Sequence, residues 1–109
     1  MNDVRSILDD WQHGLIDDEQ AMEASGCDSV GELYVAAYAA DVEIRFARPV
    51  VVQIRGVMSG DPVIAGTRVR PGCIIAEFEA RGADGIRESY PTLPEGAVAA
   101  AWKWVHGKT

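Results

Sequence analysis

The chain has 109 residues, 48% of them hydrophobic and 25% charged, which suits one compact domain or a small domain with an appended helical arm. These values exclude a disordered chain, a collagen-like rod and a coiled coil, and the apolar stretches are too short for a membrane-spanning helix of ~18 residues. The start of the sequence does not have the pattern of a signal peptide, so we expect a cytoplasmic protein. Cys27 and Cys73 stand in no zinc-ligand spacing, so we expect buried, reduced thiols and neither a metal nor a cofactor.

The net charge of -7 is unevenly divided along the chain. Residues 1–44 carry eleven acids and one base, Arg5, for a net charge of -10, whereas residues 45–109 carry nine bases and six acids, for +3. This asymmetry predicts an acidic face for a basic protein and a mildly basic face that could lie near nucleic acid. The alternative is a solvated helical surface whose charges only confer solubility.

The first part of the chain predicts three helices. A first amphipathic helix, ending near Gly14, is indicated by apolar residues at helical spacing: Val4, Ile7, Leu8, Trp11 and Leu15. Asp17 and Gln20 form a capping box for a second helix that ends at residues 25–26, and Ser29 with Glu32 opens a third. Residues 1–43 are therefore predicted to form an acidic helical arm.

From residue 43 the apolar period changes to two. Residues 44–46 and 50–54 read as strands, residues 56–60 as a turn, and residues 62–65 as a returning strand. Gly66 and Thr67 then suit a structural turn, while Arg68 is equally compatible with an ion pair and with an exposed anion contact.

The last third of the chain predicts three more helices of unequal length. Pro71 opens the first and Gly82 ends it, Asp84 caps a short second helix, and a Thr92–Glu95 capping box opens the last. The core of this unit is assigned to four large side chains: Phe78, Ile86, Tyr90 and Trp102. The outline is that of a helix-turn-helix unit. The predicted fold is mainly α with a small β-hairpin: the arm at residues 1–43, then a hairpin and tri-helical domain at residues 44–109.

Residues 60–71, Gly-Asp-Pro-Val-Ile-Ala-Gly-Thr-Arg-Val-Arg-Pro, resemble the motif Gly-x-Pro-x-Ile-x-Gly-Thr-Arg-Ile of the DUF433 family of domains of unknown function. Gly82, the Tyr90-Pro91-x-Leu93 turn and residues 98–100 match further family positions, so the resemblance covers about residues 50–105. It implies a homeodomain-like, winged-helix-like fold, related to antitoxins that pair with PIN-type ribonuclease toxins. Residues 1–43 lie outside it.

The last predicted helix lacks base-reading side chains near its start, so DNA contact would rest on phosphates. The candidate phosphate-binding residues are Arg45, Arg48, Arg55, Arg68 and Arg70. The Gly/Ala face of that helix predicts a homodimer contact instead, with an exposed tryptophan beside it: Gly96, Ala97, Ala100 and Trp104.

The acidic arm is the candidate surface for a basic partner: Asp9, Asp10, Trp11, Asp17, Asp18 and Glu19. No set of nucleophile, base or metal ligands stands in a catalytic pattern, so we expect no enzyme activity and no catalytic residues. The leading hypothesis is an antitoxin-like protein that binds a basic partner and weakly binds its own operator; the resemblance implies a PIN-type ribonuclease as that partner. The alternative is a dimeric adaptor or assembly protein that binds no DNA.

Overall fold

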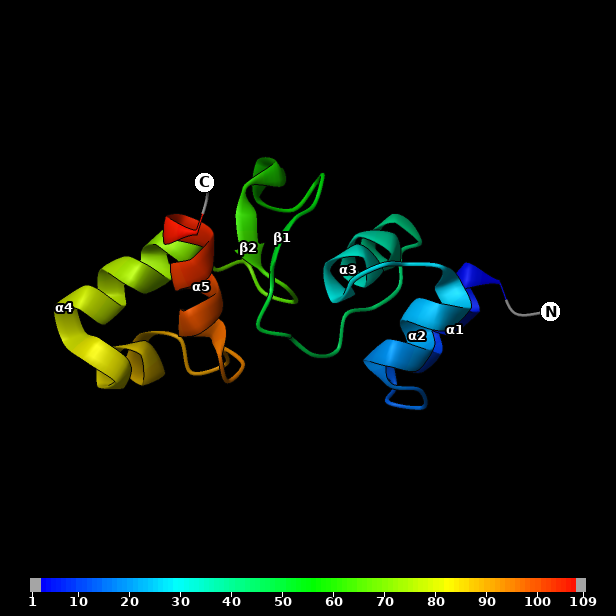
Figure 1. Cartoon of the computed structure of the whole chain (residues 1–109), viewed down its shortest axis with the longest axis horizontal. Helices are drawn as coiled ribbons and strands as arrows, with labels where there is room; N and C mark the ends of the chain where they lie inside the picture. The colour runs from blue at the N-terminus through cyan, green and yellow to red at the C-terminus, as the bar shows by residue number, and fades with distance from the viewer. Residues whose placement is uncertain (1–2, 108–109) are drawn as a thin grey trace. The chain divides into compact units, whose positions relative to one another are not determined.

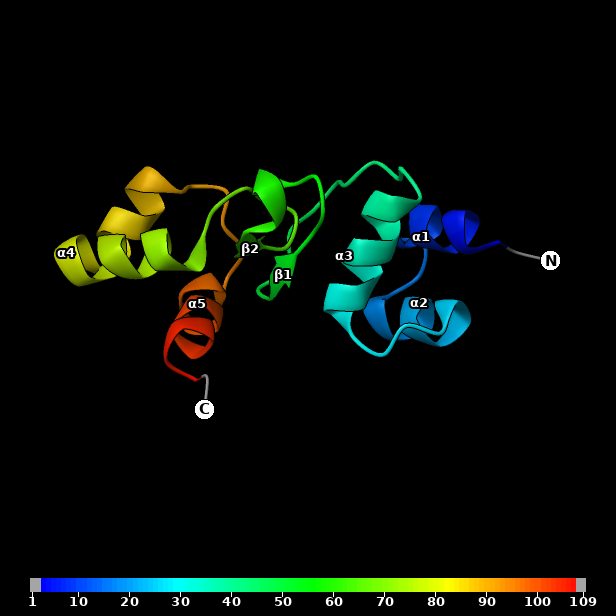
Figure 2. The same cartoon turned by 90° about the horizontal axis from the view of Figure 1, so that it is seen from above.

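The computed structural model describes residues 3–107 and is mainly helical with a small antiparallel hairpin, which confirms the predicted fold class (Figures 1 and 2). The chain divides into two compact units, Met1–Phe46 and Ala47–Thr109. Each has its own elements and is described by itself.

The described residues of the N-terminal unit form three helices: α1 (Val4–Gln12), α2 (Asp18–Ser25) and α3 (Val30–Ala39). The α2 capping box is formed as predicted, because Asp17 accepts from the Gln20 amide (2.8 Å) and the Gln20 side chain accepts from the Asp17 amide (2.9 Å). Ser29 caps α3 by accepting from the Glu32 amide at 3.1 Å. The predicted helix starts are therefore confirmed by the side chains that satisfy their free amides.

An aromatic cluster forms the core of the N-terminal unit. The Trp11 ring is 1% exposed and meets the rings of Tyr34 and Phe46 edge-on, at centroid distances of 5.0 and 5.5 Å. The Tyr34 hydroxyl donates to the Phe46 carbonyl (2.9 Å), and the Trp11 indole donates to Asp18 (2.7 Å). The buried Leu8, Leu33 and Ala37 belong to the same core, which fixes the ends of all three helices.

The predicted strand at residues 44–46 is not formed. Its backbone is extended but pairs with no strand, and it is held instead by the Arg45 amide, which donates to the buried Gln12 side chain at 2.6 Å. The predicted α1 stripe is also too long, because Val4 and Leu15 are exposed. Val4 lies in the first turn and Leu15 beyond the last, so neither reaches the core.

The C-terminal unit begins with the hairpin. Strand β1 (Val51–Gln53) pairs antiparallel with β2 (Pro62–Ile64), in a register that places Val52 opposite Val63. A short 3-10 turn, η1 (Met58–Gly60), joins them. Both strands are shorter than predicted, since pairing ends where the turn residues begin.

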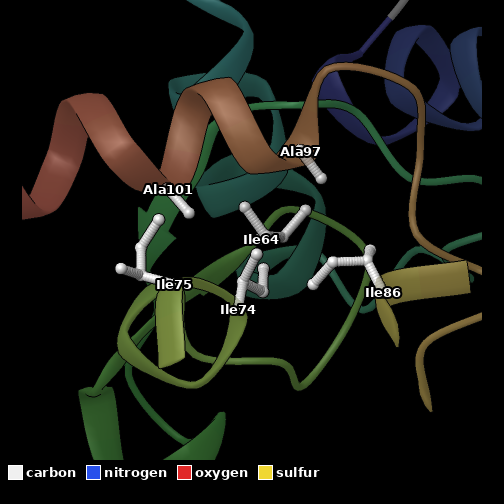
Figure 3. Packing of buried hydrophobic residues seen from close by; sticks show 6 residues of the cluster. All are labelled: Ile64, Ile74, Ile75, Ile86, Ala97 and Ala101. Atoms are coloured by element: carbon white, nitrogen blue, oxygen red, sulfur yellow. The ribbon is translucent and has the colours of Figure 1, made fainter. Parts of the chain in front are cut away.

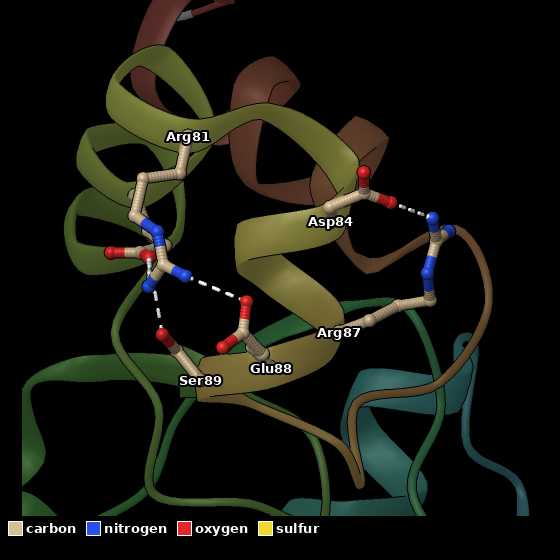
Figure 4. A network of polar contacts seen from close by, with 6 residues as sticks. Arg81, Asp84, Arg87, Glu88 and Ser89 are labelled. Atoms are coloured by element: carbon tan, nitrogen blue, oxygen red, sulfur yellow. Dashed lines mark hydrogen bonds and ion pairs between the residues drawn. The ribbon is translucent and has the colours of Figure 1, made fainter.

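Helix α4 (Pro71–Ser89) is two helical segments joined at Gly82, which has φ 71° and ψ -163°. The predicted break is therefore confirmed. Figure 4 shows the polar network that spans it: Arg81 bonds Glu77 at 3.0 Å and Glu88 at 2.7 Å, and the Ser89 hydroxyl donates to Glu77 at 3.1 Å.

Two predicted caps in this unit are wrong. Asp84 lies inside the second segment of α4 and pairs with Arg87 rather than capping a helix (Figure 4). Helix α5 (Ala97–His106) begins after Gly96, not at a Thr92–Glu95 capping box. Gly96 has φ 88°, a left-handed conformation that interrupts any helix begun at Thr92.

The core of the C-terminal unit lies between β2, α4 and α5, and Figure 3 shows its buried members: Ile64, Ile74, Ile75, Ile86, Ala97 and Ala101. Of the four predicted anchors, Ile86 is buried and Tyr90 packs against this cluster. Phe78 and Trp102 are 38% and 47% exposed, so their assignment to the core is wrong. The small Ala97 and Ala101, one helical turn apart, face the core instead, and Trp102 lies about 100° further around the helix.

Candidate interaction surfaces

The N-terminal unit is an acidic surface. Residues 1–46 contain eleven acids and two arginines, a net charge of -9. Nine of the acids are exposed and the other two half-buried. Arg5 donates to the Ala40 carbonyl rather than to a carboxylate, and the Asp9–His13 pair (3.5 Å) carries an ionic attraction only when the histidine is protonated. Most of the negative charge therefore faces solvent.

The predicted partner-binding residues have different roles. Asp9 and Glu19 are exposed and Asp10 is half-buried, whereas Asp17 caps α2 and Asp18 accepts the indole hydrogen bond of Trp11. Trp11 itself was predicted at the surface, and this is wrong: its ring belongs to the core and is closed to a partner. An indole suits both a core and an interface, and in this unit the Trp11 indole packs against the Tyr34 and Phe46 rings and bonds to Asp18.

The sequence prediction missed one surface feature of this unit, Leu15. It was assigned to the core stripe, yet it is 72% exposed in the loop after α1, where its amide donates to the Asp10 carbonyl at 3.0 Å. Acidic pairs precede and follow it in the chain. The signal available was its position after Gly14, the residue at which the helical period ends.

A groove of about 480 Å³ lies along α2 and the loop after it. Its lining is Asp17, Glu19, Gln20, Met22, Glu23, Gly26, Cys27 and Asp28. Carboxylates dominate its walls, which gives this side of the unit a chemistry suited to basic side chains. Cys27 is half-buried here and Cys73 is exposed on α4; both are free thiols, so the expectation that they are buried is wrong.

The candidate phosphate-binding arginines of the C-terminal unit are found at both ends of the hairpin, with Arg48, whose amide donates to the Ala65 carbonyl at 3.2 Å, at the same end as Arg68. Arg45 belongs to the N-terminal unit and the other four to the C-terminal unit. Arg70 is paired with Asp61 at 2.8 Å. Arg55 follows β1 and Arg68 follows β2, so the antiparallel hairpin places them at its opposite ends.

The Gly-Thr pair before Arg68 is structural, as predicted. Gly66 has φ 83°, the Thr67 hydroxyl donates to the Ile64 carbonyl at 2.8 Å, and the Val69 amide donates to that hydroxyl oxygen at 3.1 Å. The turn is followed by Arg68, which is exposed.

The predicted dimer face of α5 is partly covered by the same chain: Ala97 is buried, Ala100 and Trp104 are half-buried, and Gly96 is exposed. Ala97 is 3% exposed and Ala100 packs against the core, while a Cβ built on Gly96 lies 3.3 Å from Pro49. Trp104 was expected to be exposed; it is half-buried and lines a groove of about 430 Å³ with Pro49, Val50, Val51 and Ala100. The small residues thus allow α5 to approach its own hairpin; Ala97 is closed to a second copy, and a dimer contact through the rest of this face stays a prediction.

A larger groove, about 670 Å³, lies between the second segment of α4, the loop at residues 90–96 and the start of α5. Ile86, Leu93 and Val98 give it apolar walls, with Arg87 and Glu95 as its charged residues. Such a groove suits an apolar side chain of a protein. Among residues 3–107, no group of three or more His, Cys, Asp or Glu side chains is placed to hold a metal ion, and no helix is long and apolar enough to cross a membrane.

Residues 51–105 match a family model described as a protein of unknown function, DUF433. The chain belongs to the DUF433 family. The DUF433 region starts at the first residue of β1 and reaches the last turn of α5, so helices α1 to α3 lie outside it. No curated protein and no solved structure matches the chain.

Proposed function

We propose that this DUF433 protein is a cytoplasmic, antitoxin-like binding protein whose acidic N-terminal unit binds a basic partner protein. The proposal is supported by the uneven distribution of acidic residues and by how few of those in the N-terminal unit have a basic partner. In the C-terminal unit, arginines already pair with four of the six acids: Asp61, Glu77, Asp84 and Glu88. The N-terminal unit has eleven acids, nine of them exposed, and only two arginines.

This imbalance has an electrostatic consequence. Carboxylates that share one surface repel each other, and the apolar core around Trp11 has to offset that repulsion. A basic protein relieves the repulsion on binding, and the field of the acidic unit steers it during approach. The exposed Leu15 adds an apolar contact within the same surface. The proposed interaction is therefore fast to form and sensitive to salt.

The class of partner, a PIN-type ribonuclease toxin, comes from the family resemblance of residues 60–71 and not from the acidic unit. The proposed role is inhibition by binding, with no chemical step. Operator binding is a weaker part of the proposal, because Arg55 and Arg68 lie at opposite ends of the hairpin and the start of α5 carries no base-reading side chain, so the proposed contacts are to phosphates.

An adaptor that binds no DNA is the second candidate. It is favoured by the exposed start of α5, where Glu95 and Ala99 offer no base-reading group while Ala97 is buried. A mobility-shift series on upstream DNA at increasing salt separates the two functions, since phosphate contacts weaken steeply with salt.

The main test uses matched charge variants of the full chain. Glu19→Gln/Glu23→Gln removes two charges from the acidic unit without touching a cap, and Glu79→Gln/Glu95→Gln removes two exposed charges from the C-terminal unit. With the partner that co-purifies at native expression, the first pair should slow association several-fold at low salt and leave dissociation nearly unchanged. Equal effects of the two pairs would show that only net charge matters and would refute the assignment to the acidic unit.

A further inference from the structure

Strand β1 uses only one of its two edges within the hairpin. The Ala65 amide donates to the Val50 carbonyl at 2.8 Å, so the backbone carbonyl of Val50 points toward β2. Backbone groups of a strand alternate between its two sides. The N–H and C=O groups of Val51 and Gln53 therefore point away from β2.

The two outer edges of this hairpin differ. The outer edge of β2 is occupied by its own chain, since the Ile64 amide donates to the Val69 carbonyl at 3.0 Å. Within residues 3–107, the outward groups of Val51 and Gln53 have no hydrogen-bond partner. No Lys, Pro or bulge interrupts Val51–Gln53, the devices that usually protect an open edge.

This edge is complementary to itself. If an identical strand lies antiparallel to it with Val52 opposite Val52 of the second copy, then Val51 lies opposite Gln53 of that copy, and the reverse pair forms by symmetry. Each such pair exchanges two hydrogen bonds, so the outward groups of both strands are all satisfied. A two-fold axis at Val52 is the arrangement that a closed homodimer requires.

The neighbouring residues are compatible with this register. Arg48 lies before the bend at Pro49, and Arg55 lies in the turn after β1, so neither arginine belongs to the paired segment Val51–Gln53. The two Val52 side chains would form a cross-strand pair of β-branched residues, and Gln53 of the second copy would lie beside Val51, at the rim of the groove under α5.

We propose that two copies of this chain associate through the outer edge of β1, in the order β2-β1-β1-β2, as one antiparallel four-stranded sheet. A two-stranded hairpin is barely stable by itself, and this pairing doubles its width. The paired segment is short, so the dimer is weak and concentration-dependent. It does not involve the Gly/Ala face of α5, where Ala97 is buried by its own chain.

The first test compares two substitutions at one exposed position in the full chain. Gln53→Pro removes an outward N–H from each copy while leaving the pairing with β2 intact, because Pro is tolerated where the N–H faces away from the sheet. Gln53→Ala loses the same side-chain bond to Gly60 but keeps the N–H. Sedimentation equilibrium up to ~500 µM should give a dimer for the wild type and for Gln53→Ala, and at least about tenfold weaker association for Gln53→Pro.

Circular dichroism confirms that each variant is folded. A wild type that stays monomeric at the highest concentration would overturn the proposal, as would a folded Gln53→Pro protein that dimerises with an unchanged constant. The latter result would place the contact elsewhere, for example on the exposed Trp102 and Val105 of α5.

The second test reports the register and does not depend on Gln53→Pro folding. In a background of Cys27→Ser and Cys73→Ser, Val52→Cys places two thiols opposite each other in a non-hydrogen-bonded pair, ~4.5 Å apart between Cα atoms, within disulfide range. Gln53→Cys gives a more exposed thiol, but in this register the two introduced thiols lie two residues apart along the paired strands. Mild oxidation should cross-link the Val52→Cys protein much faster; equal rates, or no cross-link, would overturn the proposal.

Discussion

Gly82 offers the sharpest test of how the C-terminal unit is built. Its φ of 71° and ψ of -163° lie in a region that is essentially restricted to glycine, so Gly82→Ala should lower the free energy of unfolding by about 1 to 3 kcal/mol. Apart from its chain neighbours and the adjacent helical backbone, no described atom lies within 4 Å of a Cβ built at this position, so the loss would come from the backbone conformation. For a domain of this size such a loss is a large part of a stability of about 5 to 15 kcal/mol.

Gly72 provides the matched control on the same element. It lies in the first turn of α4, has an ordinary helical backbone, and likewise has open space at its Cβ. Gly72→Ala should therefore leave stability unchanged or raise it by up to about 1 kcal/mol. Urea unfolding followed by far-ultraviolet circular dichroism measures both. If Gly82→Ala loses less than about 0.5 kcal/mol, the break in α4 is not imposed by this residue and the reasoning fails.

Three further predictions follow from the same structure. Trp11→Ala should lower the free energy of unfolding of the N-terminal unit by ~3 to 5 kcal/mol, because it removes the aromatic core and leaves Asp18 without the indole donor; a loss under ~1 kcal/mol would contradict the burial of that ring. Trp102→Ala should change the free energy of unfolding by less than ~1 kcal/mol, whereas Ala101→Leu should lower it by ~1 to 3 kcal/mol through overpacking. If thermal unfolding shows the larger loss for Trp102→Ala, the helix orientation predicted from the sequence is the correct one. If DNA is bound, Arg68→Ala should flatten the dependence of log affinity on log salt by ~0.9, whereas Arg70→Ala should change it less because Asp61 already pairs with that guanidinium; equal changes in a salt titration would argue against this difference.

The sequence predicted best what is determined by local chemistry. The Asp17–Gln20 capping box and the break at Gly82 depend on residues within one or two turns of each other, and both are formed. The extended segment at residues 44–46 has the alternation of a strand, yet a strand needs a partner that the alternation does not reveal. Its actual partner, the side chain of Gln12, lies 33 positions away from Arg45 in the chain.

The orientation of α5 could not be predicted for a different reason. Residues 97–105 are apolar at every position except Lys103, so the pattern does not distinguish an inward face from an outward one. The large Trp102 looked like the core residue, but the fully buried positions of α5 are the small Ala97 and Ala101, with Val98 and Ala100 packed beside them. The placement of the arginines at both ends of the hairpin could not be predicted from the sequence either, because the tertiary fold sets the distance between those ends.

The junction between the two units has a consequence for how proteins of this kind can be divided and recombined. Phe46 contacts Trp11 and Tyr34 in the N-terminal core, while the Arg48 amide already donates to Ala65 in the C-terminal unit at 3.2 Å. Ala47 alone separates these two attachments. A polypeptide cut after residue 43 would lose Phe46 from its aromatic core, whereas one cut at Ala47 would keep it. Genetic exchange of the acidic helices for another recognition module should therefore succeed at this codon and fail three or four codons upstream.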